Sequence, residues 1–388
     1  MKDVVVVGAG PAGCSVARDL AEQGYDVAVF EKRQEIGAPK RCGEGLSSSA
    51  VEELELDIPD SCKTQSIDGA LVYSPSGDRV VIDSRETVGW IVERKMFDKW
   101  MAVRASESGA EIRARSEVVD LLPDNEGVIV EIDGERKEIE SEMVIAAGGV
   151  ESLIARKAGV RDQSYTNLVD SGYQYEMANL KLEDKNKLEL YFGDEVAPRG
   201  YVWVFPKGDS VANVGIGISG EMEETAKHYL DKFLENNDRF ENTSIIEVNS
   251  GMIPVGGFLG DMVAKNFLVV GDAANQVNPI HGGGIREGIK AGKIASEVVS
   301  RCLSEDDTSR ENLEEYNDIW WDRRGRDLMK VENLREVLEE LDDEDLDYLA
   351  KKLKGQDLMD FTQGKRLSKL GRLLLKRPKM IKSAKKLL

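Results

Sequence analysis

The chain has 388 residues, 41% of them hydrophobic, which is typical of a globular protein with room for two domains and excludes a disordered chain. Its formal net charge of −20 argues against nucleic-acid binding, because contacts with phosphates need a basic surface. The four cysteines form no Cys-x-x-Cys pair and there are only two histidines, so we expect no metal site and no disulfide framework, as is typical of a reducing cytoplasm.

A strand–helix–strand unit opens the chain. Residues 4–7 are four consecutive valines, which predicts a strand buried on both faces. Residues 11–23 predict a helix, and residues 26–30 predict a second strand. Because the same residues complete this unit, we interpret the N-terminus as part of a parallel sheet and not as a signal peptide.

The turn of this unit reads Gly-Ala-Gly-Pro-Ala-Gly over residues 8–13 and matches the dinucleotide-binding pattern. Gly8 allows a tight turn, Gly10 lets the backbone approach a pyrophosphate, and Gly13 lets the helix pack on the strand. Glu31 ends the second strand, where a carboxylate can accept hydrogen bonds from a ribose. The alternative is a glycine-rich turn that binds no ligand.

The middle of the chain is rich in strands. A hairpin pattern predicts strands at 70–73, 80–83 and 90–93, and a helix is predicted at 94–108. A small antiparallel layer is predicted at 118–122, 127–132 and 137–139, and a buried strand at 143–147. A second β-rich block and its helix are predicted at 172–177, 187–192, 200–206, 211–218 and 223–236. Strand 267–270, helix 284–304 and a helical region from 310 onward follow.

A second glycine-rich turn follows strand 267–270. Gly271 and Asp272 end the strand, and residues 279–285 read Pro-Ile-His-Gly-Gly-Gly-Ile at the start of a helix. Asp272 can bind a ribityl hydroxyl, and amides at the helix N-terminus can stabilise the negative charge of a reduced flavin. Two such turns in this order and spacing favour FAD over NAD as the cofactor.

The sequence therefore predicts an α/β protein. We expect a glutathione-reductase-like Rossmann FAD domain, an inserted antiparallel β-rich substrate domain and a helical C-terminal region. The expected boundaries are 1–65 with 91–165 and 255–308 for the FAD-binding domain, 66–90 with 166–254 for the substrate domain, and 309–388 for the C-terminal region.

Two further segments narrow the interpretation. Residues 40–47 read Lys-Arg-Cys-Gly-Glu-Gly-Leu-Ser, and residues 201–208 read Tyr-Val-Trp-Val-Phe-Pro-Lys-Gly. With both glycine turns, over about residues 1–300, the chain resembles the para-hydroxybenzoate-hydroxylase-like flavoproteins and, more narrowly, the geranylgeranyl reductase family.

This resemblance implies a set of flavin contacts. Arg94 fits physically, because a cation at the start of a helix below the nucleotide can reach its phosphates or ribityl chain; the alternative is a surface arginine. The implied contacts are Ala12, Glu31, Cys42, Gly43, Gly45, Arg94, Val118, Asp272, Gly284 and Ile285.

One departure concerns the electron donor. Aromatic hydroxylases of the superfamily carry an Ala-Asp-Gly segment with a serine three residues after the glycine, and here residues 147–152 read Ala-Gly-Gly-Val-Glu-Ser. The missing acid at Gly148 weakens the case for NADPH as the direct reductant. NAD(P)H, ferredoxin and a deazaflavin system all stay open as donors.

Tyr201, Trp203 and Phe205 alternate and therefore share one face of a strand, which Pro206 follows. Beside a flavin such a rigid apolar wall suits a long hydrocarbon; the alternative is ordinary sheet core. The resemblance implies hydride transfer from flavin N5 to carbon–carbon double bonds in geranylgeranyl chains of archaeal-type membrane lipid precursors. Geranylgeranyl diphosphate and chlorophyll are the main variants.

The reaction also needs a proton donor, and two side chains are candidates. Cys42 lies in a glycine-rich loop expected near the flavin, and His281 borders the second glycine turn. The alternatives are a packing cysteine that contacts the cofactor through its backbone and a solvent-facing residue at a helix start. The residues alone assign no catalytic acid.

The C-terminal tail is basic and amphipathic, although no apolar run reaches the ~18 residues of a membrane span. Residues 361–388 contain ten lysines and arginines, no acid, and interleaved leucines. Two interpretations stay open: contact with an anionic lipid surface, which makes a cytoplasmic protein peripheral at the inner membrane face, or pairing with the acidic stretch 339–347.

Two other functions compete with an isoprenoid-chain reductase. One is a flavin monooxygenase or halogenase that acts on a small aromatic molecule, against which Gly148 and the Cys42 loop count. The other is a flavin electron carrier without catalysis, against which the aromatic row counts because a carrier needs no substrate wall.

Overall fold

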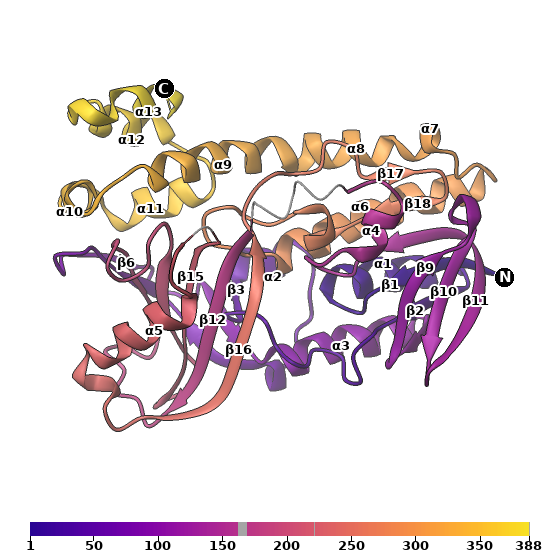
Figure 1. The fold of residues 1–388 in the computed structure, drawn as a ribbon, viewed down its shortest axis with the longest axis horizontal. Coiled ribbons are helices and arrows are strands. Elements are labelled where there is room, and N and C mark those ends of the chain that lie inside the picture. The colour runs from indigo at the N-terminus through magenta and orange to yellow at the C-terminus, as the bar shows by residue number, and fades with distance from the viewer. Residues whose placement is uncertain (162–168, 221, 388) are drawn as a thin grey trace.

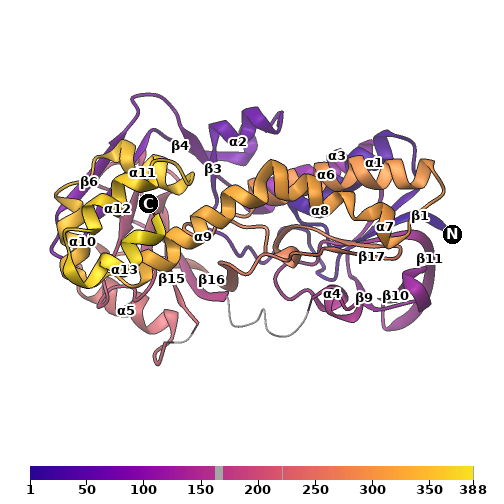
Figure 2. The ribbon, with the colours of Figure 1, turned by 90° about the horizontal axis from the view of Figure 1, so that it is seen from above.

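Two sheets lie side by side along the long axis of the molecule, and helices cover them from above (Figures 1 and 2). The computed structural model describes residues 1–161, 169–220 and 222–387. The first sheet holds the chain's N-terminal unit, and the second faces the C-terminal helices.

The first sheet has eight strands in the order β17-β18-β11-β1-β2-β8, with β9 and β10 attached through β11. Its central strands are parallel, and Val4, Val5 and Val6 of β1 are fully buried, as a strand covered on both faces requires. Helices α1 and α6 pack against each other on this sheet. The bounds are β1 (Lys2–Val7), α1 (Pro11–Glu22), β2 (Val27–Phe30), α3 (Arg94–Glu107), β8 (Glu111–Arg113), β9 (Ser116–Leu121), β10 (Gly127–Ile132), β11 (Glu135–Ala146), α4 (Leu153–Lys157), β17 (Val263–Ala264), β18 (Phe267–Val269) and α6 (Ile285–Ser304).

β11 is one long strand where the sequence predicted two, at 137–139 and 143–147. Its first half pairs antiparallel with β10, and its second half runs parallel to β1 from Ser141 onward. The first half is largely exposed and charged, whereas the second half is buried. The sequence suggests two strands because β11 changes from exposed and charged to buried at the point where its neighbour changes from β10 to β1.

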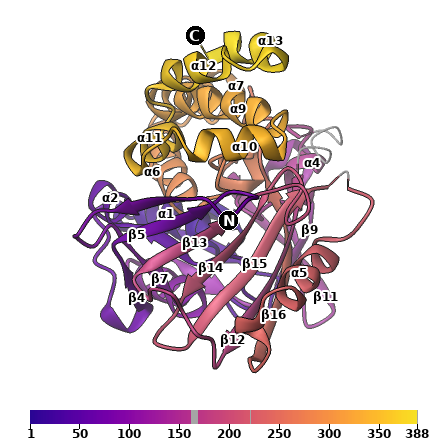
Figure 3. The ribbon, with the colours of Figure 1, turned by 90° about the vertical axis from the view of Figure 1, so that its left-hand side faces the viewer.

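The second sheet has seven strands in the order β16-β12-β15-β14-β13-β5-β6, all antiparallel except the pair β5 and β13. Helix α5 covers one face of this sheet, and the C-terminal helices lie above it (Figure 3). The bounds are β5 (Gly69–Tyr73), β6 (Arg79–Asp83), β12 (Val169–Ala178), β13 (Lys187–Tyr191), β14 (Tyr201–Pro206), β15 (Val211–Ser219), α5 (Ala226–Glu235) and β16 (Ser244–Pro254).

Two features of this region differ from the prediction. The edge strand β16 was not predicted, because Glu247, Asn249 and Gly251 interrupt its apolar pattern. The strand predicted at 90–93 does not extend the hairpin of β5 and β6. It forms β7 (Gly89–Val92) in a separate small sheet with β3 (Gly45–Ser47) and β4 (Lys63–Ile67). Helix α2 (Ser48–Glu53) follows β3 directly.

The C-terminal region is helical, as predicted, and has a small core of its own that includes Leu334, Phe361, Leu370 and Leu374. Among the residues that the structure describes, no helix is long and apolar enough to cross a membrane. The bounds are α7 (Arg310–Leu313), α8 (Glu315–Trp320), α9 (Arg326–Glu339), α10 (Asp343–Ala350), α11 (Gly355–Thr362), α12 (Leu367–Leu374) and α13 (Ile381–Ala384).

Candidate active site

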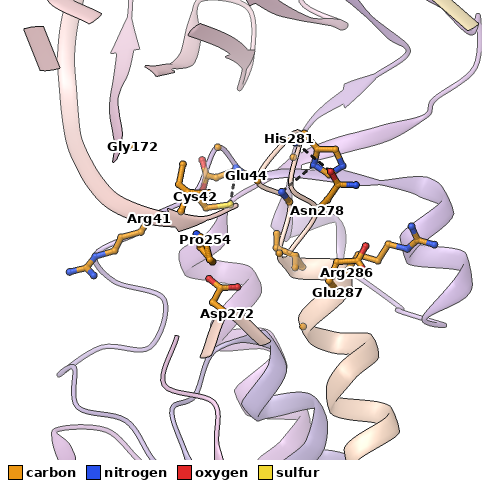
Figure 4. Close-up of a pocket in the computed structure, with 18 of the residues that line it drawn as sticks. Arg41, Cys42, Glu44, Gly172, Pro254, Asp272, Asn278, His281, Arg286 and Glu287 are labelled. Atoms are coloured by element: carbon orange, nitrogen blue, oxygen red, sulfur yellow. Dashed lines mark hydrogen bonds between the residues drawn. The ribbon is translucent and has the colours of Figure 1, made fainter. Parts of the chain in front are cut away.

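A cavity of about 1320 Å³ extends from the first sheet, across one face of the second, to the C-terminal helices. Every site residue predicted from the sequence lines it except Gly13 and Pro206. Figure 4 shows the Cys42 loop, Asp272 and the turn with His281 arranged around this space. Both glycine turns and the aromatic row therefore border one continuous cavity.

The first glycine turn has the geometry that a dinucleotide needs. Gly8 has φ +104°, and a Cβ there would lie 2.5 Å from the Ala147 carbonyl oxygen. A Cβ at Gly13 would lie 2.0 Å from the Gly8 oxygen, so only glycine lets the helix approach the strand so closely. A Cβ at Gly10 would meet nothing within 4 Å. This open space lies at the N-terminus of α1, where unpaired amides favour a phosphate.

Glu31 is fixed at the end of β2 by two backbone amides. Ala9 N donates to Oε2 at 3.0 Å, and Arg33 N donates to Oε1 at 2.9 Å. Each carboxylate oxygen keeps a second lone pair for a ribose hydroxyl. Val118 of β9 also lines this end of the cavity.

The second glycine turn presents Asp272 to the cavity. Burial raises the pKa of Asp272, and the cations Arg94 and Arg161 oppose that rise. No side-chain hydrogen bond among the described residues ends on its carboxylate, so both oxygens can accept from a polyol. A Cβ at Gly284, the residue that precedes α6, would lie 2.8 Å from Oδ1 of Asp272. The residues at both turns thus fit FAD.

Arg94 begins α3 and lines the cavity beside Asp272. Its guanidinium makes two hydrogen bonds of 2.9 Å with Asp98. Burial opposes its charge, but Asp98 and the Cys42 thiol raise the pKa of Arg94 above its ordinary value, so it remains a cation. Its predicted contact with the flavin stays a prediction.

The Cys42 loop lies between the flavin turns and the aromatic row. The Cys42 sulfur accepts a hydrogen bond of 3.2 Å from Glu44 N. A Cβ at Gly43 would lie 3.0 Å from the ring of Phe205, and a Cβ at Gly45 would lie 3.8 Å from that ring. The glycines therefore let the loop lie directly against the aromatic row.

A buried charge cluster that the sequence did not reveal holds this loop in place. Lys207 Nζ lies 2.8 Å from Glu44, 2.7 Å from Glu93 and 2.9 Å from Glu176. Lys40, whose side chain is fully buried, contacts Glu44 at 3.3 Å and also pairs with Glu176. The three carboxylates are close enough to hold a metal ion, but these two ammonium groups already supply the positive charge. The only signal in the sequence was that Lys40 and Glu44 lie within segment 40–47 and Lys207 lies within segment 201–208.

His281 is exposed to the cavity yet lies deep in the protein, and desolvation there lowers its pKa to about 4. Its Nδ1 accepts a hydrogen bond of 3.1 Å from Gly283 N, which leaves the proton on Nε2. The ring is thus neutral near pH 7 and suited to donating a hydrogen bond. Its carbonyl accepts from the Tyr201 hydroxyl at 3.0 Å.

Tyr201, Trp203 and Phe205 all face the cavity, with successive ring centroids 5.8 and 6.2 Å apart. Pro206 does not line it, because side chains alternate along a strand and Pro206 is buried on the other side. Pro206 can end the row but cannot contact a ligand in this cavity.

Beyond the aromatic row the cavity becomes an aliphatic slot between the second sheet and the C-terminal helices. The sheet contributes Ala70, Val72, Val80, Ile82, Leu188 and Leu190. The C-terminal helices and the loop between α10 and α11 contribute Leu334, Leu338, Leu346, Leu349, Leu353, Leu358, Phe361 and Leu370. The helical part was missed, since an amphipathic pattern does not say what its apolar face covers.

Part of the basic tail pairs with the acidic stretch 339–347. Arg377 pairs with Glu344 and Asp345, and Lys379 pairs with Asp342. Lys376, Lys382 and Lys385 are exposed and make no ion pair with any residue that the structure describes. The acidic stretch thus accounts for some of the tail's charge.

Known proteins resemble the chain over its whole length. Residues 169–253 match the family described as geranylgeranyl reductase catalytic domain, and residues 3–59 match FAD dependent oxidoreductase. Digeranylgeranylglycerophospholipid reductase of Methanocaldococcus jannaschii is 40% identical over 395 residues, which cover 100% of this chain and 98% of that protein. Digeranylgeranylglycerophospholipid reductase 1 of Methanothermobacter thermautotrophicus is 39% identical over 355 residues, which cover 90% of this chain and 89% of that protein.

Solved structures resemble the fold. A geranylgeranyl bacteriochlorophyll reductase-like protein from Thermoplasma acidophilum superimposes with a TM-score of 0.90 at 32% identity, covering 100% of this chain and 99% of that one. A flavin-dependent brominase superimposes with a TM-score of 0.72 at 19% identity, covering 94% of each chain. The second likeness concerns the fold alone.

Proposed function

This chain belongs to the family of digeranylgeranylglycerophospholipid reductases, and from that premise we propose that it reduces carbon–carbon double bonds in the geranylgeranyl chains of an archaeal-type membrane lipid precursor. It is a FAD-dependent oxidoreductase. The observation that carries the proposal is the single cavity in which a site that fits FAD continues into an aliphatic slot. A flavin monooxygenase or halogenase has less support, since its solved counterparts share only the fold.

Binding and orientation come from residues at the polar end of the cavity. Gly10 and the start of α1 would hold the pyrophosphate, Glu31 the ribose, and Asp272 the ribityl chain. When FAD is bound and reduced, it supplies the hydride. Gly284 and the N-terminus of α6 face the cavity there, so their amides can stabilise negative charge.

An isolated double bond is a poor hydride acceptor, so it must be held close to the hydride donor. The slot can provide this positioning. The aromatic row and the aliphatic walls would exclude water and hold the chain beside the flavin site. The C20 prenyl chain itself has no polar groups, so within the slot it is held by shape and apolar contact. That requirement fits a cavity whose far end is lined by leucines.

Of the two proton-donor candidates, the geometry supports Cys42 better. His281 is neutral and accepts at Nδ1, so its Nε2 proton is a poor acid. The Cys42 thiol lies in the loop that borders both the flavin turns and Phe205. Cys42→Ala should lower the rate of reduction while Cys42→Ser retains part of it; equal rates in Cys42→Ala and wild type would remove Cys42 from this role.

We also propose that the tail meets an anionic membrane surface from the cytoplasmic side. Lys376, Lys382 and Lys385 lie unpaired among the described residues beside Leu375 and Ile381, which are 38% and 41% exposed. Changing all three lysines to glutamate should reduce co-sedimentation with anionic vesicles at low salt. Unchanged co-sedimentation would contradict the membrane role. Truncation is a poor test because Leu370 and Leu374 belong to the helical core.

The central test is lipid mass spectrometry. Protein reduced with dithionite and incubated with an unsaturated digeranylgeranylglycerophospholipid should add two hydrogens for each double bond reduced. Rapid NADPH-dependent oxygen consumption with an aromatic substrate, and no mass gain on any prenyl lipid, would favour the monooxygenase instead.

A further inference from the structure

Three residues form a row across the floor of the cavity. Gln174 of β12, Gly215 of β15 and Trp203 of β14 lie opposite one another in register. The Trp203 Nε1–H donates a hydrogen bond of 2.9 Å to Gln174 Oε1, across the intervening strand. A Cβ at Gly215 would lie 2.4 Å from the Trp203 ring. The missing side chain at Gly215 therefore lets the indole reach an amide two strands away.

The other end of the same amide holds the flavin loop. Gln174 Nε2 donates a hydrogen bond of 3.2 Å to the Cys42 carbonyl oxygen. Gln174 is 4% exposed and Trp203 is 7% exposed, so neither bond is replaced easily by water. One buried amide thus joins the aromatic wall of the slot to the loop beside the flavin turns.

We infer that Gln174 is a positioning residue for the reduction, and that it sets the distance between the Trp203 ring and the Cys42 loop. This inference rests on the proposed function. The slot holds a prenyl chain by shape, so its depth relative to the flavin depends on where the aromatic wall stands. A displacement of about 1 Å is enough to lower the rate of a reaction that needs a near-attack geometry.

Substitutions can separate a positioning role from simple packing, because the Trp203–Gln174 and Gln174–Cys42 hydrogen bonds can each be removed without the other. Gln174→Leu removes both bonds. Gln174→Glu keeps the acceptor for Trp203 and loses the donor to Cys42. Trp203→Phe keeps the Gln174–Cys42 bond and loses the other. Gly215→Ala leaves both partners in place but pushes the indole off the sheet.

Two readouts are needed, and the first uses no lipid. The visible absorption of bound, oxidised FAD should shift in Gln174→Leu and Gln174→Glu, because both remove the hydrogen bond that Gln174 donates to the Cys42 carbonyl oxygen. It should stay close to wild type in Trp203→Phe. The matched control is Gln65→Leu, since Gln65 donates to Asn186 at 2.8 Å outside the cavity. That variant should leave the flavin spectrum unchanged.

The second readout is steady-state reduction of the lipid well below the unfolding temperature. Gln174→Leu and Gly215→Ala should each lower kcat by about tenfold or more, with KM changed by no more than about twofold. Gln174→Glu should recover part of kcat. If Gln174→Leu fails to fold, Gln174→Glu and Trp203→Phe carry the test.

A purely structural Gln174 would lower the unfolding temperature of these variants and leave kcat and the flavin spectrum as in wild type. That result would overturn the inference. Failure of the proposed function has a different signature, since wild type would then reduce no prenyl lipid while the Gln174 variants still shifted the flavin spectrum.

Discussion

Replacing Lys207 with methionine removes an ammonium group that three carboxylates share beneath the Cys42 loop. The nitrogen lies 2.7 to 2.9 Å from Glu93, Glu44 and Glu176, and the Glu44 side chain is fully buried. Methionine keeps the apolar stem, so the change isolates the charge. We expect a strong loss of stability, because a buried carboxylate left without its partner cannot recover hydration.

The loss of stability in Lys207→Met depends on the positive charge that Lys40 still supplies to the carboxylates. Removing one partner of a buried ion pair costs about 3 to 5 kcal/mol. Lys40 still contacts Glu44 at 3.3 Å, which places the expected loss near the lower end, about 3 kcal/mol. With an unfolding entropy of about 2.1 cal/mol/K per residue, a chain of this size loses about 1.2 °C per kcal/mol, so the unfolding temperature should fall by about 4 °C.

The assay is thermal unfolding followed by circular dichroism at several pH values. Burial alone raises the pKa of Glu176, but Lys40 and Lys207 lower it below its ordinary value of 4.5. The stabilisation by this carboxylate is therefore complete above pH 4.5 and is lost as the pH falls through the folded pKa. The difference between variant and wild type should thus be largest near neutrality and shrink in acid.

The matched control is Lys185→Met, because Lys185 pairs with Asp209 and the two side chains are 53% and 85% exposed. That pair should contribute about 0 to 1 kcal/mol. Equal, small shifts in the two variants would refute the argument that the buried cluster holds the loop.

Three further outcomes follow from the cofactor end of the cavity. Glu31→Ala should weaken FAD binding by about tenfold or more, because the carboxylate that two amides orient is lost; an unchanged FAD-to-protein ratio after gel filtration would contradict this. Gly10→Val should abolish FAD binding while the unfolding free energy of the apoprotein changes by no more than about 1 kcal/mol, because its side chain would enter open space; retained FAD would show that the phosphate lies elsewhere. His281 has a folded pKa of about 4 against an ordinary value of 6.5, so the unfolded state binds more protons in that window and stability should fall as the pH drops through it; urea unfolding of His281→Gln should show a smaller fall, and identical pH slopes would argue against the neutral ring.

The two glycine turns were predictable because their constraints are local. Gly8 is required by its positive φ and Gly13 by its approach to the Gly8 oxygen, both within one strand–turn–helix unit, so their spacing in the sequence already contains the geometry. The aromatic row was predictable for the same reason, since a period of two places Tyr201, Trp203 and Phe205 on one face. The same period places Pro206 on the opposite face, outside the cavity.

The contacts that join these parts were not predictable from the sequence. The Gln174–Trp203 bond depends on the register of three strands, and Gly215 between them has meaning only once that register is known. The partners of Lys207 come from three other parts of the chain. A single sequence shows spacing within an element but not which distant elements become neighbours.

Anaerobic single-turnover absorbance tests most directly whether the flavin site and the slot form one reaction chamber. Protein with fully reduced FAD is mixed with an unsaturated digeranylgeranyl lipid or, as the control, with its fully saturated counterpart. We predict that the absorbance of oxidised flavin returns with the unsaturated lipid alone, in step with the double bonds reduced. Flavin that stays reduced with every unsaturated prenyl lipid would contradict it.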